Sequence, residues 1–457
     1  MAPAMPLWTA LQTEIAEVDS RNVETLAQAY SEFQTGKTRV LIAFRHPNAT
    51  DPYVLSHLLW RDLPQTARQM GLRLKKPHSH FIYDRGIPLW AGSYLGWVFS
   101  RLGGIPIQRG KLDLMALKTA RELFLNGQFP LAAAPEGGNN GHNEIVSPLE
   151  PGIAQLAFWC AEDLQAAKRN QSVVIVPVGI QYRYLEEPWH HLETLISELE
   201  NDSGIGLPNE SEMDHLKEHF LISSKNNQTT ESSTLREHAS LYVRLYRLAE
   251  HLLSLMEGYY KEFYGVDFEQ RDIASDNQAL SEPNAANTAL GDRLHALMDK
   301  ALHVTEKYFN VRPKGSVIDR CRKLEQAGWD RIFREDTPGL APVELGLANR
   351  VAEEANLRLW HMRLVESFVA VTGCYVRENP TADRFAETTL LLRDMIHKIK
   401  GQPESRPNLG RQKAIVTVGD RIEVSSRLGD YRQTRRGAIA QLTQDLQSKM
   451  EDLIIKT

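Results

Sequence analysis

From residue 38 to residue 184 the chain alternates short apolar runs with longer segments whose apolar residues recur at helical spacing. Runs such as 39–44 and 173–182 have the length and the β-branched content of strands. The expected strands are 39–44, 80–83, 104–108, 130–134 and 173–182, and the expected helices between them are 52–69, 90–101, 111–126 and 151–168. Strands separated by helices form parallel pairs rather than hairpins. The alternation therefore predicts an α/β fold with a largely parallel sheet flanked by helices.

The two ends of the chain and its second half follow other patterns. Residues 188–410 contain many helical segments and few strand-like runs, whereas strand signal returns at 414–419 and is followed by a helix at 435–453. Near the start, Trp8, Leu11, Ile15 and Val18 recur at helical spacing. The predicted organisation is an N-terminal helical segment at 1–37, the first part of the α/β domain at 38–187, a large mainly α-helical insertion at 188–410, and the closing strand and helix of the α/β domain at 411–457.

Composition excludes several classes of protein. A chain of 457 residues with 42% apolar and 24% charged content can form a substantial core. Its net charge of −5 gives no general attraction to polyanions, so no nucleic-acid binding is expected. The three scattered cysteines and the pair His190-His191 lack metal-ligand spacing, and an odd number of cysteines suits a reducing compartment. With no secretory signal, and with a longest uncharged apolar segment of only about 22 Å as a helix, the sequence predicts a cytoplasmic protein.

The turn after the first expected strand contains a histidine and an aspartate. Asp51 followed by Pro52 is a favourable helix start. The aspartate side chain can accept hydrogen bonds from backbone N–H groups of the first turn, which have no partner within the helix, and proline at the first helical position lacks an N–H that would have had no partner there. His46 then lies in the turn, where its ring can meet the Asp51 carboxylate. That carboxylate would fix the ring tautomer and stabilise the imidazolium, which makes His46 a candidate base. The alternative is that Asp51 only caps the helix, because this spacing alone is too short to be specific.

Three further segments follow in order: 104–110, which ends in Gln108-Arg109-Gly110, then Pro135-Glu136-Gly137, and then Val176-Pro177-Val178. Together with the HxxxxD pair His46 and Asp51 they resemble the four sequence blocks of the glycerolipid acyltransferase superfamily, of the 1-acylglycerol-3-phosphate type. The resemblance covers roughly residues 38–185 and owes its specificity to the order and spacing of all four blocks. One departure is Gly138-Asn139-Asn140, which stands where the family usually has Thr-Arg-Ser.

The resemblance implies an enzyme of phospholipid biosynthesis. Such an acyltransferase moves a fatty acyl group from the thioester of acyl-CoA or acyl carrier protein to a hydroxyl of a lysophospholipid or glycerol-phosphate acceptor. His46 would be the general base, oriented by Asp51, and the deprotonated hydroxyl would attack the thioester directly. No metal and no cofactor is implied.

The resemblance also indicates substrate-binding residues. Arg109 follows an apolar strand and would bind a phosphate or carboxylate, although an ordinary charged strand end is the simpler alternative. Glu136 would orient the acceptor, while Gly137 and Gly138 would let the backbone approach the substrate. The alternative for these three residues is an ordinary turn.

Two questions stay open at the level of sequence. Trp90, Tyr94 and Trp97 share one helical face, which suits either a core or a peripheral contact with lipid headgroups. A basic run from Lys398 to Arg436 suits either anionic lipid or an exposed linker. The chain is therefore expected to be a peripherally membrane-associated enzyme. The alternatives are a non-catalytic lipid-binding or scaffold protein that keeps the fold, and an acyltransferase for a non-phosphate lipid acceptor.

Overall fold

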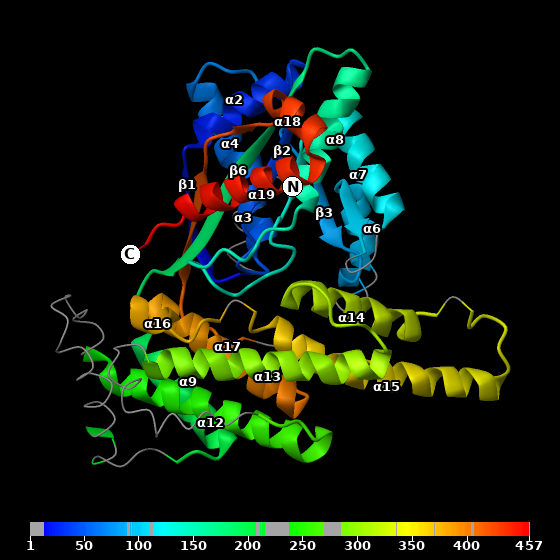
Figure 1. Cartoon of the computed structure of the whole chain (residues 1–457). Helices are drawn as coiled ribbons and strands as arrows, with labels where there is room; N and C mark the ends of the chain where they lie inside the picture. Colours follow the sequence, from blue (N-terminus) through cyan, green and yellow to red (C-terminus); the bar gives the residue numbers. More distant parts are fainter. Residues whose placement is uncertain are drawn as a thin grey trace. The chain divides into compact units, whose positions relative to one another are not determined.

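A computed structural model describes residues 13–88, 92, 94–108, 113–206, 211, 213–214, 237–268, 285–334, 336–369, 371–403 and 406–456 of the chain. These residues form two compact units. The first consists of Met1–Glu186 together with Gly410–Thr457, and the second is Glu187–Leu409. The first unit is built around a β-sheet and the second from helices (Figure 1).

The described residues of the first unit form an eight-stranded, mostly parallel sheet. Its strands are β1 (Ile15–Arg21), β2 (Thr38–Phe44), β3 (His80–Asp84), β4 (Gly104–Ile107), β5 (Leu131–Ala133), β6 (Ser172–Tyr184), β7 (Gln412–Val418) and β8 (Ile422–Glu423). The order across the sheet is β1-β7-β6-β2-β5-β3-β4, and β8 pairs with β6. Strands β6, β2, β5, β3 and β4 are mutually parallel, whereas β7 and β8 are antiparallel to β6. The predicted α/β fold with a largely parallel sheet is thus confirmed.

Helices cover both faces of this sheet (Figure 1). On one face α2 (Val23–Gln34), α3 (Asp51–His57), the π-helical turn η1 (Leu58–Asp62) and α4 (Leu63–Gln69) pack on one apolar cluster. On the other face α7 (Leu114–Asn126), α8 (Gly152–Ala166), α18 (Leu428–Gln433) and α19 (Arg435–Asp452) pack on a second cluster. Alternate side chains of the central strand β2 enter the two clusters, with Val40 and Ile42 in one and Leu41 and Ala43 in the other. A strand buried on both faces explains the continuous apolar run in the sequence.

The start of the chain differs from the helical expectation. Residues 1–12 lie outside the described part, and Ile15–Arg21 is the strand β1 rather than a helix. β1 pairs in parallel with β7, with Val18 opposite Ala414. This pairing satisfies the backbone groups at the edge of β7, which would otherwise be open. The helical spacing of Ile15 and Val18 is compatible with either structure, and a helix begins only at Val23.

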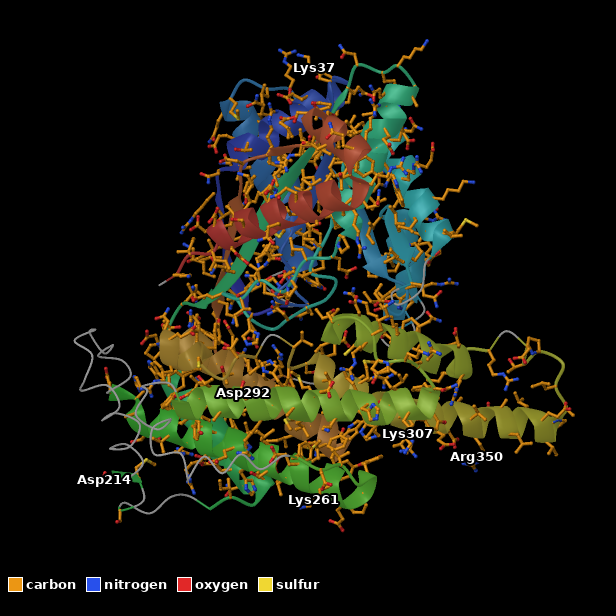
Figure 2. All side chains as sticks on the ribbon, in the orientation of Figure 1. Lys37, Asp214, Lys261, Asp292, Lys307 and Arg350 are labelled. Carbon is orange, nitrogen blue, oxygen red and sulfur yellow. The ribbon has the colours of Figure 1, made fainter. Side chains whose placement is uncertain are left out.

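The second unit is helical in its described residues. Its helices include α9 (Trp189–Ser203), α12 (Ala239–Tyr264), α13 (Ala285–Phe309), α14 (Val317–Ile332), α15 (Pro342–Glu366), α16 (Tyr375–Glu378) and α17 (Ala382–Lys400). Charged side chains such as Lys261, Lys307 and Arg350 lie on its surface (Figure 2). No helix among the described residues has the length and apolar content that crossing a membrane requires.

Candidate active site

The candidate site lies at the carboxyl edge of the sheet, where β2 and β5 end side by side. The two strands are parallel, and Ala43 of β2 stands opposite Ala133 of β5. The residues that follow these strands therefore meet at one edge. His46 comes two residues after the end of β2, and Glu136 comes three residues after the end of β5.

His46 and Asp51 form a close pair, as the sequence predicted. The Nδ1 atom of His46 lies 2.7 Å from Oδ2 of Asp51. The same carboxylate oxygen accepts the Asn48 N–H at 3.0 Å, so the carboxylate binds the turn that carries His46. The side chain of Asp51 is fully buried, whereas that of His46 is 28% exposed. One ring nitrogen is thus held by a buried carboxylate while the ring remains open to solvent.

A buried tyrosine completes the surroundings of Asp51. Tyr182, near the end of β6, donates its hydroxyl hydrogen to Oδ1 of Asp51 and accepts a hydrogen bond from Thr50 Oγ1 at 3.2 Å. Burial, and secondarily the Asp51 charge, raise the pKa of Tyr182 well above its usual value. The hydroxyl therefore remains a donor. Asp51 takes its hydrogen bonds from groups outside its own helix, which distinguishes it from a simple helix cap.

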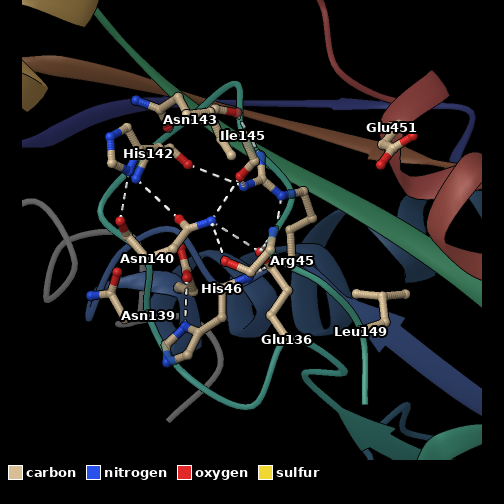
Figure 3. A network of polar contacts seen from close by, with 12 residues as sticks. Arg45, His46, Glu136, Asn139, Asn140, His142, Asn143, Ile145, Leu149 and Glu451 are labelled. Carbon is tan, nitrogen blue, oxygen red and sulfur yellow. Dashed lines mark hydrogen bonds and ion pairs between the residues drawn. The ribbon is translucent and has the colours of Figure 1, made fainter. Parts of the chain in front are cut away.

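Glu136 holds the backbone of the same turn. Its Oε1 accepts the N–H of His46 at 3.0 Å, and its Oε2 accepts the Ser147 N–H at 2.9 Å and the Asn140 Nδ2 at 3.1 Å. The carboxylate is buried. Figure 3 shows Glu136 between His46 and the loop after β5. The residue thus connects the turn that contains His46 to this loop through direct hydrogen bonds.

Arg45 is the fully buried cation of this network. Its guanidinium donates to the backbone carbonyls of Asn143 at 2.5 Å, Ile145 at 2.6 Å and His142 at 3.0 Å (Figure 3). Its Nε lies 3.6 Å from Oε1 of Glu136, which makes a buried ion pair. Removing one partner of such a pair leaves an uncompensated charge and typically costs about 3–5 kcal/mol. Arg45 therefore fixes the 142–145 loop over the end of β2.

Gly138-Asn139-Asn140, which stands where the family usually has Thr-Arg-Ser, belongs to the same loop. Asn139 Oδ1 accepts the Gly141 N–H at 2.8 Å, and Asn140 Oδ1 accepts the His142 N–H at 3.0 Å. The amide nitrogen of Asn140 donates to Ile145 O at 2.7 Å in addition to Glu136. Ahead of them, Gly137 has φ 72°, a left-handed conformation that favours glycine. The side chains here bind their own loop, and the Asn139 side chain belongs to an exposed residue.

The structure brings His46, Asp51, Glu136 and the Gly137-Gly138 turn together at one edge of the sheet. Arg109, the remaining site residue of the sequence prediction, lies outside the described residues. Sequence reasoning missed the roles of Arg45, Tyr182 and Asn140. A charged residue directly after a buried apolar strand was a usable signal for Arg45, but no local pattern marks Tyr182 as a partner of Asp51.

The fold and the site define an α/β protein with a carboxylate-bound histidine at the carboxyl edge of a largely parallel sheet. Residues 17–181, which include this pair, match the family model described as Acyltransferase. The chain thus contains an acyltransferase-family domain, which confirms the predicted family and supports acyltransferase activity in general. The match does not extend into the helical unit. No curated protein and no solved structure matches the chain.

Proposed function

We propose that the protein transfers a fatty acyl group from acyl-CoA or acyl carrier protein to a hydroxyl of a lysophospholipid or glycerol-phosphate acceptor in phospholipid biosynthesis. The observation that carries this proposal is the His46–Asp51 pair, in which a fully buried carboxylate holds a partly exposed imidazole at 2.7 Å. A histidine held in this way has one nitrogen for orientation and the other for a substrate proton.

The proposed reaction is a direct transfer. Nε2 of His46 takes the proton of the acceptor hydroxyl as its oxygen attacks the thioester carbonyl. The tetrahedral intermediate collapses, the carbon–sulfur bond breaks, and the leaving thiolate takes the proton back from the imidazolium. Asp51 stabilises the imidazolium between the two steps. General-base help of this kind typically contributes about 10²- to 10⁴-fold in rate.

Glu136, Gly137 and Gly138 have a supporting part in this proposal. The Glu136 carboxylate binds the His46 N–H, so we assign it to positioning the base turn in addition to the predicted contact with the acceptor. Gly137 in its left-handed conformation turns the chain after β5, and neither glycine carries a side chain that would hold a substrate away from the backbone.

Arg109 is proposed to bind the acceptor phosphate. This role comes from the family resemblance, because Arg109 lies outside the described residues. A charge-assisted contact of this kind is worth about 1.5–3 kcal/mol. Gly138-Asn139-Asn140 stands where the family usually has Thr-Arg-Ser, so Asn139 takes the place of the arginine, and its side-chain oxygen accepts a hydrogen bond from its own loop. We therefore expect weaker binding of a phosphate monoester than in relatives that have both arginines.

The direct test is a thiol-release assay with the purified protein. Acyl-CoA and acyl carrier protein are offered in parallel as donors, each with a panel of acceptors that includes glycerol 3-phosphate and lysophospholipids. Acceptor-dependent release of thiol, together with an ester product, is the expected result. Thiol release that needs no acceptor and gives no ester product would indicate simple hydrolysis. No thiol release at all would favour a non-catalytic lipid-binding or scaffold protein.

A second candidate is an acyltransferase for a non-phosphate lipid acceptor, and the replaced third block favours it. Arg109→Ala separates the two candidates, because it should raise the KM for a phosphate-bearing acceptor at least about tenfold if the arginine binds phosphate. Asn139→Arg is the matched gain-of-charge variant, placed at an exposed residue of the loop, and should lower that KM. If a neutral acceptor is used and its KM is the same in wild type and in both variants, the second candidate is supported.

We also propose that the enzyme acts in the cytoplasm and contacts its membrane peripherally, because a lysophospholipid acceptor is itself a component of membranes. Fractionation of cells into soluble and membrane parts at low and high salt tests this proposal. A peripheral enzyme moves from the membrane fraction to the soluble fraction when salt screens its charges.

A further inference from the structure

We propose that four exposed apolar side chains of α6 (Tyr94–Arg101) and α7 form a lipid-binding rim beside the site, and that this rim contacts a bilayer surface that contains anionic lipids. The rim residues are Tyr94, Trp97, Leu114 and Met115. The proposal deepens the proposed function, because it names the surface through which a lipid acceptor would reach His46.

The rim side chains are large and lie mostly in solvent. The exposed fractions are 66% for Tyr94, 64% for Trp97, 70% for Leu114 and 75% for Met115. Single exposed apolar residues are common on soluble proteins, but several at one edge of a sheet are typical of an interaction site. Tyr94 and Trp97 lie in the first turns of α6, and Leu114 and Met115 are the first two residues of α7.

The topology places these four residues at the same edge of the sheet as His46. Gly96 of α6 lies close to Pro88, because a Cβ atom added at Gly96 would be 3.5 Å from the Pro88 ring, and Pro88 follows the carboxyl end of β3. Asp113, the N-cap of α7, accepts the Gln108 N–H directly after β4 at 3.1 Å. Since β3 and β4 are parallel to β5 and β2, the first turns of both helices lie at the carboxyl edge, where β2 and β5 place the base turn.

Charge indicates what covers the rim. Although the chain has a net charge of −5, the segment 85–121 contains six arginine or lysine residues and one acidic residue, Asp113. The Asp113 carboxylate accepts the Ala116 and Gln108 N–H groups, and of the basic residues Arg121 is paired with Asp163. Arg101 lies over the Trp97 ring at 5.2 Å. The segment that contains the rim residues thus has an excess of positive charge in its sequence, and Arg101 lies next to Trp97, which matches the headgroup region of an anionic membrane.

The later basic run of the chain is a weaker candidate for the same contact. Its members are largely used in ion pairs within the two units. Lys400 binds Asp202 at 2.7 Å, Arg406 binds Asp394 at 2.6 Å and Lys413 binds Asp19 at 3.2 Å. The residue types of the rim also favour lipid, because tyrosine and tryptophan combine an apolar ring with a polar tip and concentrate at membrane interfaces.

Vesicle binding without substrates tests the rim directly. The full chain is mixed with vesicles of phosphatidylcholine alone or of phosphatidylcholine and phosphatidylglycerol in equal parts, and bound protein is separated by flotation. The rim variants are Tyr94→Gln/Trp97→Gln and Leu114→Gln/Met115→Gln. The matched control is Val343→Gln/Leu347→Gln on α15, where the side chains are 78% and 65% exposed and Arg350 projects into solvent nearby (Figure 2).

Wild type is expected to bind the anionic vesicles and to bind the neutral ones more weakly. Each rim variant should lose at least about fivefold in partitioning, while the control variant stays within about twofold of wild type. Equal binding by rim variants and wild type, or an equal loss in the control, overturns the proposal. A change of oligomeric state without a change in vesicle binding would instead assign the rim to a second copy of the chain.

Binding and activity separate this proposal from the proposed function. Thiol release with a short-chain acceptor, which is soluble in water, should be unchanged in the rim variants, whereas release with the same acceptor class embedded in vesicles should fall with vesicle binding. If vesicle binding depends on the rim residues but no acyl transfer is detected, the membrane contact is supported and the proposed acyltransferase activity is rejected. If acyl transfer on vesicles is the same in wild type and the rim variants, the activity is supported and the role of the rim is rejected.

Discussion

The two units of the molecule each contain a histidine held by oxygen atoms, and the two histidines differ in what remains open. In the sheet unit, His46 is bound at Nδ1 by Asp51, and its side chain is 28% exposed. In the helical unit, His361 of α15 is buried, with Nδ1 at 2.7 Å from the Tyr260 hydroxyl and Nε2 at 3.0 Å from the Tyr264 hydroxyl.

The difference lies in the number of ring nitrogens left for chemistry. Both nitrogens of His361 bind tyrosines within the helical unit, so this ring serves packing and stability. His46 uses one nitrogen for orientation, and its partner is a charged carboxylate rather than a neutral hydroxyl. A buried charge that holds a partly exposed ring is the arrangement expected of a base.

The largest expected effect is that of His46→Ala on activity. Removing the base should reduce acyl transfer by about 10³-fold or more, because no other described side chain is bonded to Asp51 in a position to accept the proton. The free energy of unfolding should change little, since the His46 side chain is partly exposed. His361→Ala is the matched control and should show the opposite pattern, a large loss of stability in the helical unit with no direct loss of chemistry. Activity of His46→Ala within about tenfold of wild type would reject the base assignment.

The second effect in size is that of Asp51→Asn. Asparagine keeps the size of the side chain. With its oxygen toward the Asn48 N–H, its amide nitrogen can donate to the Tyr182 hydroxyl, but it carries no charge to stabilise the imidazolium. We expect kcat to fall by about 10²-fold with a much smaller change in the melting temperature. Measurement of kcat and thermal unfolding on the same preparation checks both. Full activity would mean that Asp51 serves only the fold.

The third effect concerns the stability of the helical unit in acid. Burial, and secondarily the Arg358 charge, lower the pKa of His361 from 6.5 to about 4. The unfolded chain therefore binds a proton at a pH where the folded chain does not. The neutral ring contributes its full stability above pH 6.5, and this contribution is lost as the pH falls toward 4. The loss should reach about 2–3 kcal/mol.

Hydrogen exchange of α15 at neutral pH and near pH 4.5, corrected for intrinsic exchange, measures this loss in the helical unit itself. The matched variant is His361→Gln, which keeps an acceptor and a donor for the two tyrosines but does not titrate. Its protection should depend less on pH than that of wild type. Identical pH dependence in the two proteins would show that other groups cause the acid sensitivity.

The fold was predictable wherever its signals were local. The strand β2 and the helix that begins at Asp51 follow from runs of neighbouring residues, and the structure contains both. The strand β1 was not predictable in this way, because its partner β7 lies almost at the other end of the chain, with Ile15 opposite Gln412. A short apolar pattern contains no information about pairing with a strand that is so distant in the sequence.

The same distinction between local and distant contacts applies to the site. His46 and Asp51 are close in sequence, and the distance of 2.7 Å agrees with the predicted pair. The contact of Glu136 with the His46 N–H depends on the register between β2 and β5, and that of Tyr182 with Asp51 depends on the long strand β6. These contacts join residues about 90 and 131 positions apart. Local sequence patterns specify the His46–Asp51 pair but not the buried groups that hold it.

The smallest expected effect is that of Tyr182→Phe, which removes one hydrogen bond behind the pair. Without the Tyr182 donor, the Asp51 carboxylate keeps the His46 ring and the Asn48 N–H as its partners but loses the hydrogen bond to its other oxygen. The orientation of the His46 ring should then be less well fixed, and kcat at neutral pH should fall by about three- to tenfold, which corresponds to the partly compensated loss of one hydrogen bond to a charged group. Tyr30→Phe is the matched control, because it also removes a buried tyrosine hydroxyl from the sheet unit, but that hydroxyl donates to the His78 carbonyl at 3.0 Å, away from the pair. Both variants should lose some stability, and only Tyr182→Phe should lower kcat. If the two variants have the same kcat, Tyr182 supports the core alone and the orientation of His46 depends on Asp51 without it.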